Sequence, residues 1–177
     1  MKTLFGRWSL VLVSTLLAVP VLGQESGGLG IAHRGLNVFA EFSAARSGQG
    51  VGTLWGGSAG SFLQGHVLGF GLRATEVPSG DSVHVFDAVA GPRVAVGLPF
   101  VSLFLDTGGG VGHSGYYNRD GNFGSSWGPA WQANIGATHA FLPRLSWRIL
   151  EVGYGRIYTG PGVSPLFVST GLTLHLW

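Results

Sequence analysis

The chain has 177 residues, of which 45% are hydrophobic, 10% are charged, 32 are glycine and none is cysteine. The lack of cysteine excludes a disulfide framework, and the length favours a single folded domain. A soluble domain usually has about 25% charged residues, so this composition suits a surface in lipid better than one in water.

The first 23 residues are typical of a secretory signal peptide. Lys2 and Arg7 are followed by residues 8–23, which carry no charge. That stretch is short for a membrane-spanning helix of about 20 apolar residues, so a transmembrane anchor is the less favoured alternative. We expect cleavage after Gly23. The predicted divisions are a signal peptide at 1–23, an N-terminal segment at 24–35 and a barrel domain at 36–177.

Removal of the signal changes the charge of the chain. The full sequence has ten Lys and Arg residues and eight Asp and Glu residues. Lys2 and Arg7 belong to the signal, so eight residues of each sign remain and none is Lys. The mature chain lacks the basic patch that nucleic-acid binding requires, and we expect no nucleic-acid partner.

Eight strand-like segments follow the signal, and turn residues separate them. Glycine recurs every few residues and disfavours helices, and no later apolar run has the length of a helical membrane span. The predicted strands are residues 36–46, 51–62, 66–76, 83–96, 100–111, 128–141, 145–158 and 165–177.

The links between these strands alternate in kind. Those after the second, fourth and sixth strands are very short, whereas the others are polar and mostly longer, with the longest at 112–126. This alternation is typical of an up-and-down barrel in an outer membrane. Lipid cannot hydrogen-bond a free edge, so the first and last strands must pair. We predict an all-β fold, an eight-stranded antiparallel transmembrane β-barrel whose lumen is filled by side chains.

Charged residues fall at inward-facing positions near the middle of several predicted strands. Buried charges are costly unless they are paired, so we predict a structural network in the lumen in which arginines bridge carboxylates. A path for protons or a ligand is the alternative. The predicted members are Glu41, Arg73, Asp87, Arg93, Asp106 and Glu151.

Aromatic residues lie near the predicted strand ends, where interfacial girdles form in membrane proteins. Ordinary core aromatics are the alternative, but these would fall nearer the strand centres. The candidates are Trp127, Trp131, Phe141, Trp147, Tyr154, Tyr158 and Trp177.

Motifs for catalysis and cofactor binding are incomplete. Residues 112–115, "GHSG", lack the last glycine of a nucleophile elbow because Tyr116 follows. Residues 107–112, "TGGGVG", lack the Lys-Ser/Thr of a phosphate loop. The six His residues match no metal-site spacing, and none has Ser two positions later, as the lipid A deacylase type has. We expect no enzyme, cofactor or metal; a lipid A-modifying enzyme and a soluble secreted β-barrel are the alternatives.

The predicted loop at 112–126 is the favoured place for a surface contact. Loops carry function more often than the scaffold does, and Tyr, Asn and Arg suit an adaptable interface. A solvated loop near lipopolysaccharide is the alternative, and the sequence names no surface partner. The candidate contact residues are Tyr116, Tyr117, Asn118, Arg119 and Asp120.

Several stretches carry a family resemblance, best over the last 80 residues or so. They are "VFDAVAGPRVAV", "FVSLFLDTGGGVG", "NIGATHAFLPRLSWRILEVGYGRIYTG" and "FVSTGLTLHLW". The sequence resembles the OmpA-like/OmpX-like family of small outer-membrane β-barrels. This resemblance implies an eight-stranded barrel in the outer membrane of a Gram-negative-type bacterium, and no single activity.

The resemblance also implies partners. They are the outer-membrane lipid and lipopolysaccharide around the barrel, and the outer-membrane assembly machinery, which recognises the C-terminal strand. The end of the chain departs from the family pattern, because Trp177 shares its strand face with His175 and Thr173 and not with the Leu residues.

Overall fold

The computed structural model describes residues 34–47, 53–79, 83–117, 123–159 and 162–177. The predicted signal peptide and most of the N-terminal segment lie outside the described residues. Within those ranges, no helix is long and apolar enough to cross a membrane.

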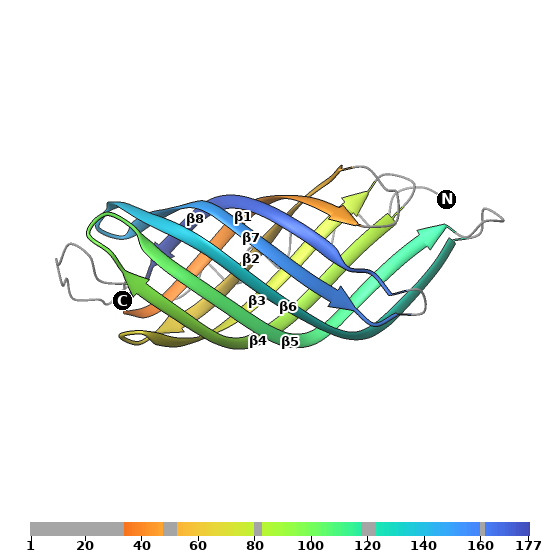
Figure 1. Cartoon of the computed structure of the whole chain (residues 1–177), viewed down its shortest axis with the longest axis horizontal. Helices are drawn as coiled ribbons and strands as arrows, with labels where there is room; N and C mark the ends of the chain where they lie inside the picture. The colour runs from red at the N-terminus through yellow and green to blue at the C-terminus, as the bar shows by residue number, and fades with distance from the viewer. Residues whose placement is uncertain (1–33, 48–52, 80–82, 118–122, 160–161) are drawn as a thin grey trace.

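The described residues form one closed barrel. Its strands are β1 (Gly35–Ser47), β2 (Thr53–Gln64), β3 (Leu68–Ser79), β4 (Val83–Gly97), β5 (Ser102–Tyr117), β6 (Phe123–Leu142), β7 (Leu145–Ile157) and β8 (Pro165–His175). Each strand pairs antiparallel with the next, and β1 pairs with β8 to close the ring (Figure 1). This arrangement confirms the predicted eight-stranded up-and-down fold.

The two ends of the barrel differ. The short links at residues 65–67, 98–101 and 143–144 lie at one end, together with the C-terminus, and we call it the turn end (left in Figure 1). The other end, where β1, β3, β5 and β7 finish, is called the loop end. Gly65 N–H donates to the Leu68 carbonyl at 2.9 Å, which closes the first of the short turns.

The β1–β8 seam gives the C-terminal strand its partner. The ladder runs from the pair Asn37–His175 to the pair Ser47–Pro165. The Leu residues of β8 face outward, whereas Thr173 is buried in the lumen. The closure leaves neither strand with a free edge, which lipid would not tolerate.

β5 and β6 are longer than the sequence suggests, and the predicted loop at 112–126 is wrong. Their ladder continues to the pair Tyr117–Phe123, and this hairpin projects beyond its neighbours at the loop end (Figure 1). The Gly, Ser and Tyr content of the segment is typical of a turn. An antiparallel ladder is nevertheless held by backbone hydrogen bonds and accepts polar residues.

β7 contains an irregularity that the alternating pattern does not predict. β7 pairs with β8 at Arg148–Gly171 and next at Glu151–Ser169, so two residues of β7 oppose Thr170 alone. This is a β-bulge, and it reverses the inward and outward alternation along the strand. The Thr170 hydroxyl donates to the Arg148 carbonyl at 2.9 Å and so satisfies the backbone at the bulge.

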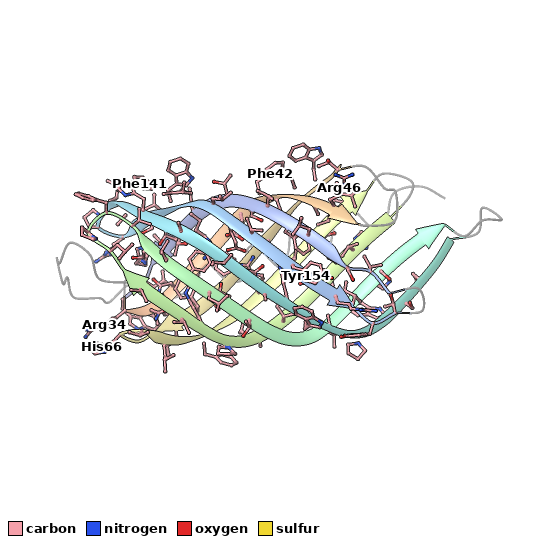
Figure 2. The ribbon with its side chains drawn as sticks, in the orientation of Figure 1. Arg34, Phe42, Arg46, His66, Phe141 and Tyr154 are labelled. Atoms are coloured by element: carbon pink, nitrogen blue, oxygen red, sulfur yellow. The ribbon has the colours of Figure 1, made fainter. Side chains whose placement is uncertain are left out.

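The outer wall of the barrel is apolar. Phe42 and Phe141 project away from the wall (Figure 2), and all seven predicted girdle aromatics are exposed. Large contiguous apolar surfaces are rare on soluble monomers. Outward-facing apolar residues occur on every strand, including Phe42, Trp55, Leu63, Phe70, Leu72, Val94, Val96, Leu103, Leu105, Ile135, Leu150, Val152, Val168 and Leu172.

The lumen is packed in layers along the barrel axis. Ionised groups occupy the middle, and Asn37, Ser146 and His175 lie at the turn end. An apolar cluster, which we call the loop-end cap, closes the other end. It consists of Ala45, Leu54, Val77, Val85, Val89, Ala130, Ile157, Val163 and Phe167.

Candidate functional site in the charged lumen

Three arginines and three carboxylates from five strands meet in the middle of the lumen, and we call them the charged layer. Because inward residues alternate with lipid-facing ones, a regular strand places only its odd or only its even positions here. β7 supplies one of each because of its bulge. The charges of the layer cancel. Its members are Glu41 on β1, Arg73 on β3, Arg93 on β4, Asp106 on β5, and Arg148 and Glu151 on β7.

Arg73 is the centre of the charged layer. Its Nη1 lies 3.1 Å from Oε2 of Glu41, and its Nη2 donates to Oε2 of Glu151 at 2.9 Å. A second bond joins Nη1 to the other Glu151 oxygen, so the Arg73–Glu151 pair is bidentate. Asp106 lies further away, with Oδ2 at 3.7 Å from Nη2. Bidentate pairs of this type combine strength with a fixed geometry.

Arg93 and Asp106 form a second pair across β4 and β5. The two residues are directly opposite in the ladder. Nη1 of Arg93 lies 2.8 Å and 2.9 Å from the two oxygens of the Asp106 carboxylate. The sequence-based prediction placed both residues in the lumen, and the structure brings them together there.

Arg148 belongs to the same layer although the sequence analysis did not include it. It is fully buried, and it contacts Glu41 through Nε and Glu151 through Nη2. Strict alternation from Glu151 places position 148 toward lipid, and the β7 bulge turns it inward. Residues 148–151, "RILE", contain a signal for this bulge. Two charged residues three positions apart in a regular strand face opposite sides, and one of them would then face lipid unless a bulge intervenes.

Aromatic rings support the guanidinium groups. The Arg148 Cζ lies 4.4 Å from the ring centroid of Phe39 and 4.3 Å from that of Phe104. Arg93 lies 4.0 Å above Phe62 and 4.1 Å above Phe104. Each desolvated cation–π contact contributes about 1–2 kcal/mol, so the rings offset part of the cost of burying the cations.

Asp87 does not join the charged layer. Its cross-strand neighbours are Thr75 on β3 and Gly112 on β5. Within the described residues no ion pair of Asp87 is present, and its buried Oδ1 has no hydrogen-bond partner. The prediction that arginines bridge all four carboxylates is therefore wrong for Asp87, because Arg73 is directed to Glu41 and Glu151.

A small cavity lies beside the charged layer. Its volume is about 30 Å³, and Arg73, Asp106, Asn134 and Phe39 are among the residues that line it. A water molecule needs about 10–15 Å³ of such space, so the cavity has room for one or two waters and not for an organic ligand. Together with the loop-end cap, this packing suits a structural core better than a passage.

The structure describes only two of the five predicted surface-contact residues. Tyr116 and Tyr117 belong to β5 and not to a loop. Asn118, Arg119 and Asp120 lie outside the described residues. In the part of the chain that the structure describes, no group of three or more His, Cys, Asp or Glu residues is placed to hold a metal ion.

Comparison with known proteins identifies the fold. No protein-family model matches the chain, and no curated protein matches its sequence. The structure is similar to Neisserial surface protein A, with a TM-score of 0.63 and 13% identity over 78% of this chain and 94% of that chain. It is also similar to the N-terminal β-barrel domain of Pseudomonas aeruginosa OprF, with a TM-score of 0.50 and 17% identity over 78% and 97%.

These neighbours are small eight-stranded outer-membrane barrels. The chain therefore has an outer-membrane-type barrel fold, consistent with the OmpA-like/OmpX-like resemblance in its sequence. At such identities the likeness establishes the fold alone, and function has to be argued from the residues.

Proposed function

We propose that this chain is an integral barrel of the outer membrane of a Gram-negative-type bacterium, with a structural and surface-contact role. The observation that supports this proposal most strongly is the inversion of polarity. Apolar side chains cover the outer wall while arginines and carboxylates are buried inside. A barrel in water would place these groups the other way round.

The two ends of the barrel support an orientation. Short turns are typical of the periplasmic side and longer hairpins of the outer side, so we place the turn end in the periplasm. The outward apolar stripe of β8 and the exposed Trp177 are the features that assembly machinery would recognise. An aromatic side chain at the turn end also suits the periplasmic interface of the outer membrane.

The projecting β5–β6 hairpin is the proposed contact surface. β6 pairs with β7 only from Ala130 onward, so in the described ranges residues 123–128 of β6 lack a strand neighbour on that side. Exposed strand edges offer backbone donors and acceptors to an extended partner. The contact would therefore depend on the hairpin backbone as well as on its side chains.

Two arginines on the outer wall favour lipopolysaccharide as the surrounding lipid. Arg46 on β1 and Arg156 on β7 are exposed near the loop end, and Figure 2 shows Arg46 beside Phe42. The Arg156 Cζ lies 5.2 Å from the ring centroid of Tyr158. Guanidinium groups bind phosphates well, and an aromatic neighbour holds such a group at the membrane interface.

An epitope tag tests location and orientation together. A tag inserted between Tyr117 and Phe123 should react with antibody on intact cells, whereas the same tag inserted between Leu98 and Val101 should react only after the outer membrane is opened. In detergent, the folded chain should migrate faster on a gel than the boiled chain. Release of the chain from cells in soluble form, or equal reactivity of both tags on intact cells, would refute the proposal.

A further inference from the structure

A serine, a histidine and an asparagine from three strands meet at the turn end of the lumen. Ser146 is the second residue of β7, His175 ends β8 and Asn37 lies near the start of β1. Ser146 Oγ is 2.6 Å from His175 Nε2, and His175 Nδ1 contacts Oδ1 of Asn37. The seam between the first and last strands brings these residues together across 138 positions of the chain.

The hydrogen bonds around Asn37 fix the direction of proton donation. Asn37 Nδ2 donates to the Gly35 carbonyl at 2.8 Å, so its Oδ1 is the atom that faces the imidazole. An amide oxygen only accepts hydrogen bonds, which places the proton of neutral His175 on Nδ1. The bare Nε2 then accepts the bond from the Ser146 hydroxyl. This is the order of donor and acceptor in a nucleophile, base and orienting group.

The surroundings of Ser146 provide a further hydrogen-bond donor. Thr173 lies directly opposite Ser146 in the β7–β8 ladder, and both face the lumen. Thr173 is 1% exposed, and its hydroxyl has no hydrogen-bond partner among the described residues. A buried, unpaired donor is costly, so this hydroxyl is available to an oxygen that develops negative charge beside Ser146. His175 is half-buried and is the last residue of β8, at the turn end of the barrel.

We infer that Ser146, His175 and Asn37 form a nucleophilic centre that carboxylic esters acylate. Ser146 Oγ attacks the ester carbonyl while His175 Nε2 takes the hydroxyl proton, and Thr173 donates to the carbonyl oxygen. The bond to the alcohol then breaks, and the alcohol leaves with the proton from His175. Water hydrolyses the acyl-serine by the same proton transfers and releases the acid. Asn37 is a positioning residue that keeps His175 in the required tautomer.

The substrate class follows from the position of the centre. All three side chains lie inside the barrel at its turn end and not on the lipid-facing wall. The ester therefore enters from the aqueous side at the turn end. The buried side chain of Phe39 lies directly opposite Thr173 in the β1–β8 ladder, so it fills the lumen beside the centre and limits the acyl group to a small one. The inference goes beyond the structural role proposed above, and it contradicts the sequence-based expectation of no enzyme, because no motif of adjacent residues encodes this centre.

A second serine cluster in the same lumen provides a matched control. Ser169 Oγ lies 2.8 Å from Ser43 Oγ, and Ser169 is as buried as Ser146. Among the described residues, no histidine is hydrogen-bonded to either serine of this pair. If burial in the lumen alone made a serine reactive, Ser169 and Ser146 would react alike.

A fluorophosphonate probe tests the inference on the full chain folded in detergent. Ser146 Oγ displaces fluoride from phosphorus, and mass spectrometry of the digested protein locates the adduct. We expect an adduct on Ser146 that Ser146→Ala removes and Ser169→Ala leaves unchanged. Loss of the general base in His175→Gln should slow labelling by about 100-fold. Asn37→Asp, which keeps an acceptor for Nδ1–H, should retain labelling that Asn37→Ala loses.

The heat-dependent gel shift confirms folding of each variant, so loss of structure is distinguished from loss of reactivity. A second assay uses p-nitrophenyl acetate, from which the folded wild-type chain should release p-nitrophenolate. A folded wild-type chain without an adduct on Ser146, or with equal labelling of Ser169, overturns the inference. Neither result affects the proposed membrane location, which the epitope tags test independently.

Discussion

Replacement of Arg148 by Met tests whether the charged layer holds the barrel together. Methionine is a flexible, unbranched side chain that can still reach toward Phe39 and Phe104, but it is shorter than arginine and has no charge and no donor. The layer then has two cations and three carboxylates. Glu41 retains its ion pair with Arg73 and the hydrogen bond from the Ser58 hydroxyl, and Glu151 retains its pair with Arg73.

The expected loss of stability is large because Arg148 is fully buried. Removal of one partner from a buried ion pair destabilises proteins by about 3–5 kcal/mol. The two cation–π contacts are lost as well, but apolar packing of methionine against the same rings offsets part of that loss. We therefore expect the free energy of unfolding to fall by about 4 kcal/mol, which at about 2 kcal/mol per molar urea is a midpoint shift of ~2 M.

The assay is urea unfolding of the chain in detergent micelles, followed by tryptophan fluorescence and by the heat-dependent gel shift. Arg156→Met is the matched control, because Arg156 lies on the same strand but is exposed on the outer wall. Its free energy of unfolding should remain within about 0.5 kcal/mol of that of the wild type, as is usual for surface changes. Equal midpoints for Arg148→Met, Arg156→Met and the wild type would show that the charged layer does not stabilise the barrel.

A double variant separates charge from packing. Glu41→Gln in the Arg148→Met background removes one excess carboxylate and leaves the Arg73–Glu151 and Arg93–Asp106 pairs. The loss in the double variant should therefore be smaller than the sum of the single losses by about 1–3 kcal/mol. Simple additivity would mean that Arg148 acts through packing alone.

Three further changes test other parts of the barrel. Asp87→Asn should raise the free energy of unfolding at neutral pH by about 1 kcal/mol, because it removes a buried charge without an ion pair. Asp106→Asn should lower it, because Asp106 is paired with Arg93. Equal effects of the two changes in urea unfolding would contradict this difference between the two carboxylates. Gly35→Ala should cost about 1–3 kcal/mol, since Gly35 has φ of 99° and an added Cβ would lie 1.7 Å from the Trp177 carbonyl oxygen. Gly109→Ala is its control, because the nearest atom to the added Cβ is 4.0 Å away. Deletion of Trp177 should lower the folded fraction in cell membranes while folding in detergent persists; an unchanged fraction would exclude a role in assembly.

The sequence predicts the regular part of the barrel well because lipid imposes strict rules. A wall that faces lipid needs apolar residues at every second position, so the strands and the pairing of β1 with β8 follow from alternation and closure. The same rules place Glu41, Arg73, Arg93, Asp106 and Glu151 in the lumen, where the structure brings them together.

The remaining features depend on geometry that alternation does not contain. Arg148 enters the charged layer through the bulge, and Asp87 stays outside it because Arg73 is directed elsewhere. β5 and β6 extend into a segment with the composition of a loop, since backbone pairing is indifferent to many side chains. The contact between Asn37 and His175 arises only when the barrel closes, because β1 and β8 are the first and last strands.

The bulge in β7 also has a genetic consequence. Loss of the single codon for Ile149 would restore simple alternation along β7. Arg148 and Glu151 would then stand two positions apart, so both would still face the lumen and Trp147 would still face lipid. Loss of a codon in the regular part of the strand, such as that for Val152, would instead turn the residues on one side of the deletion to the opposite face. The extra residue therefore bends the strand without deciding which side chains face the lumen. In-frame deletion should therefore be tolerated better at Ile149 than at Val152, a contrast that a codon-deletion library would display directly.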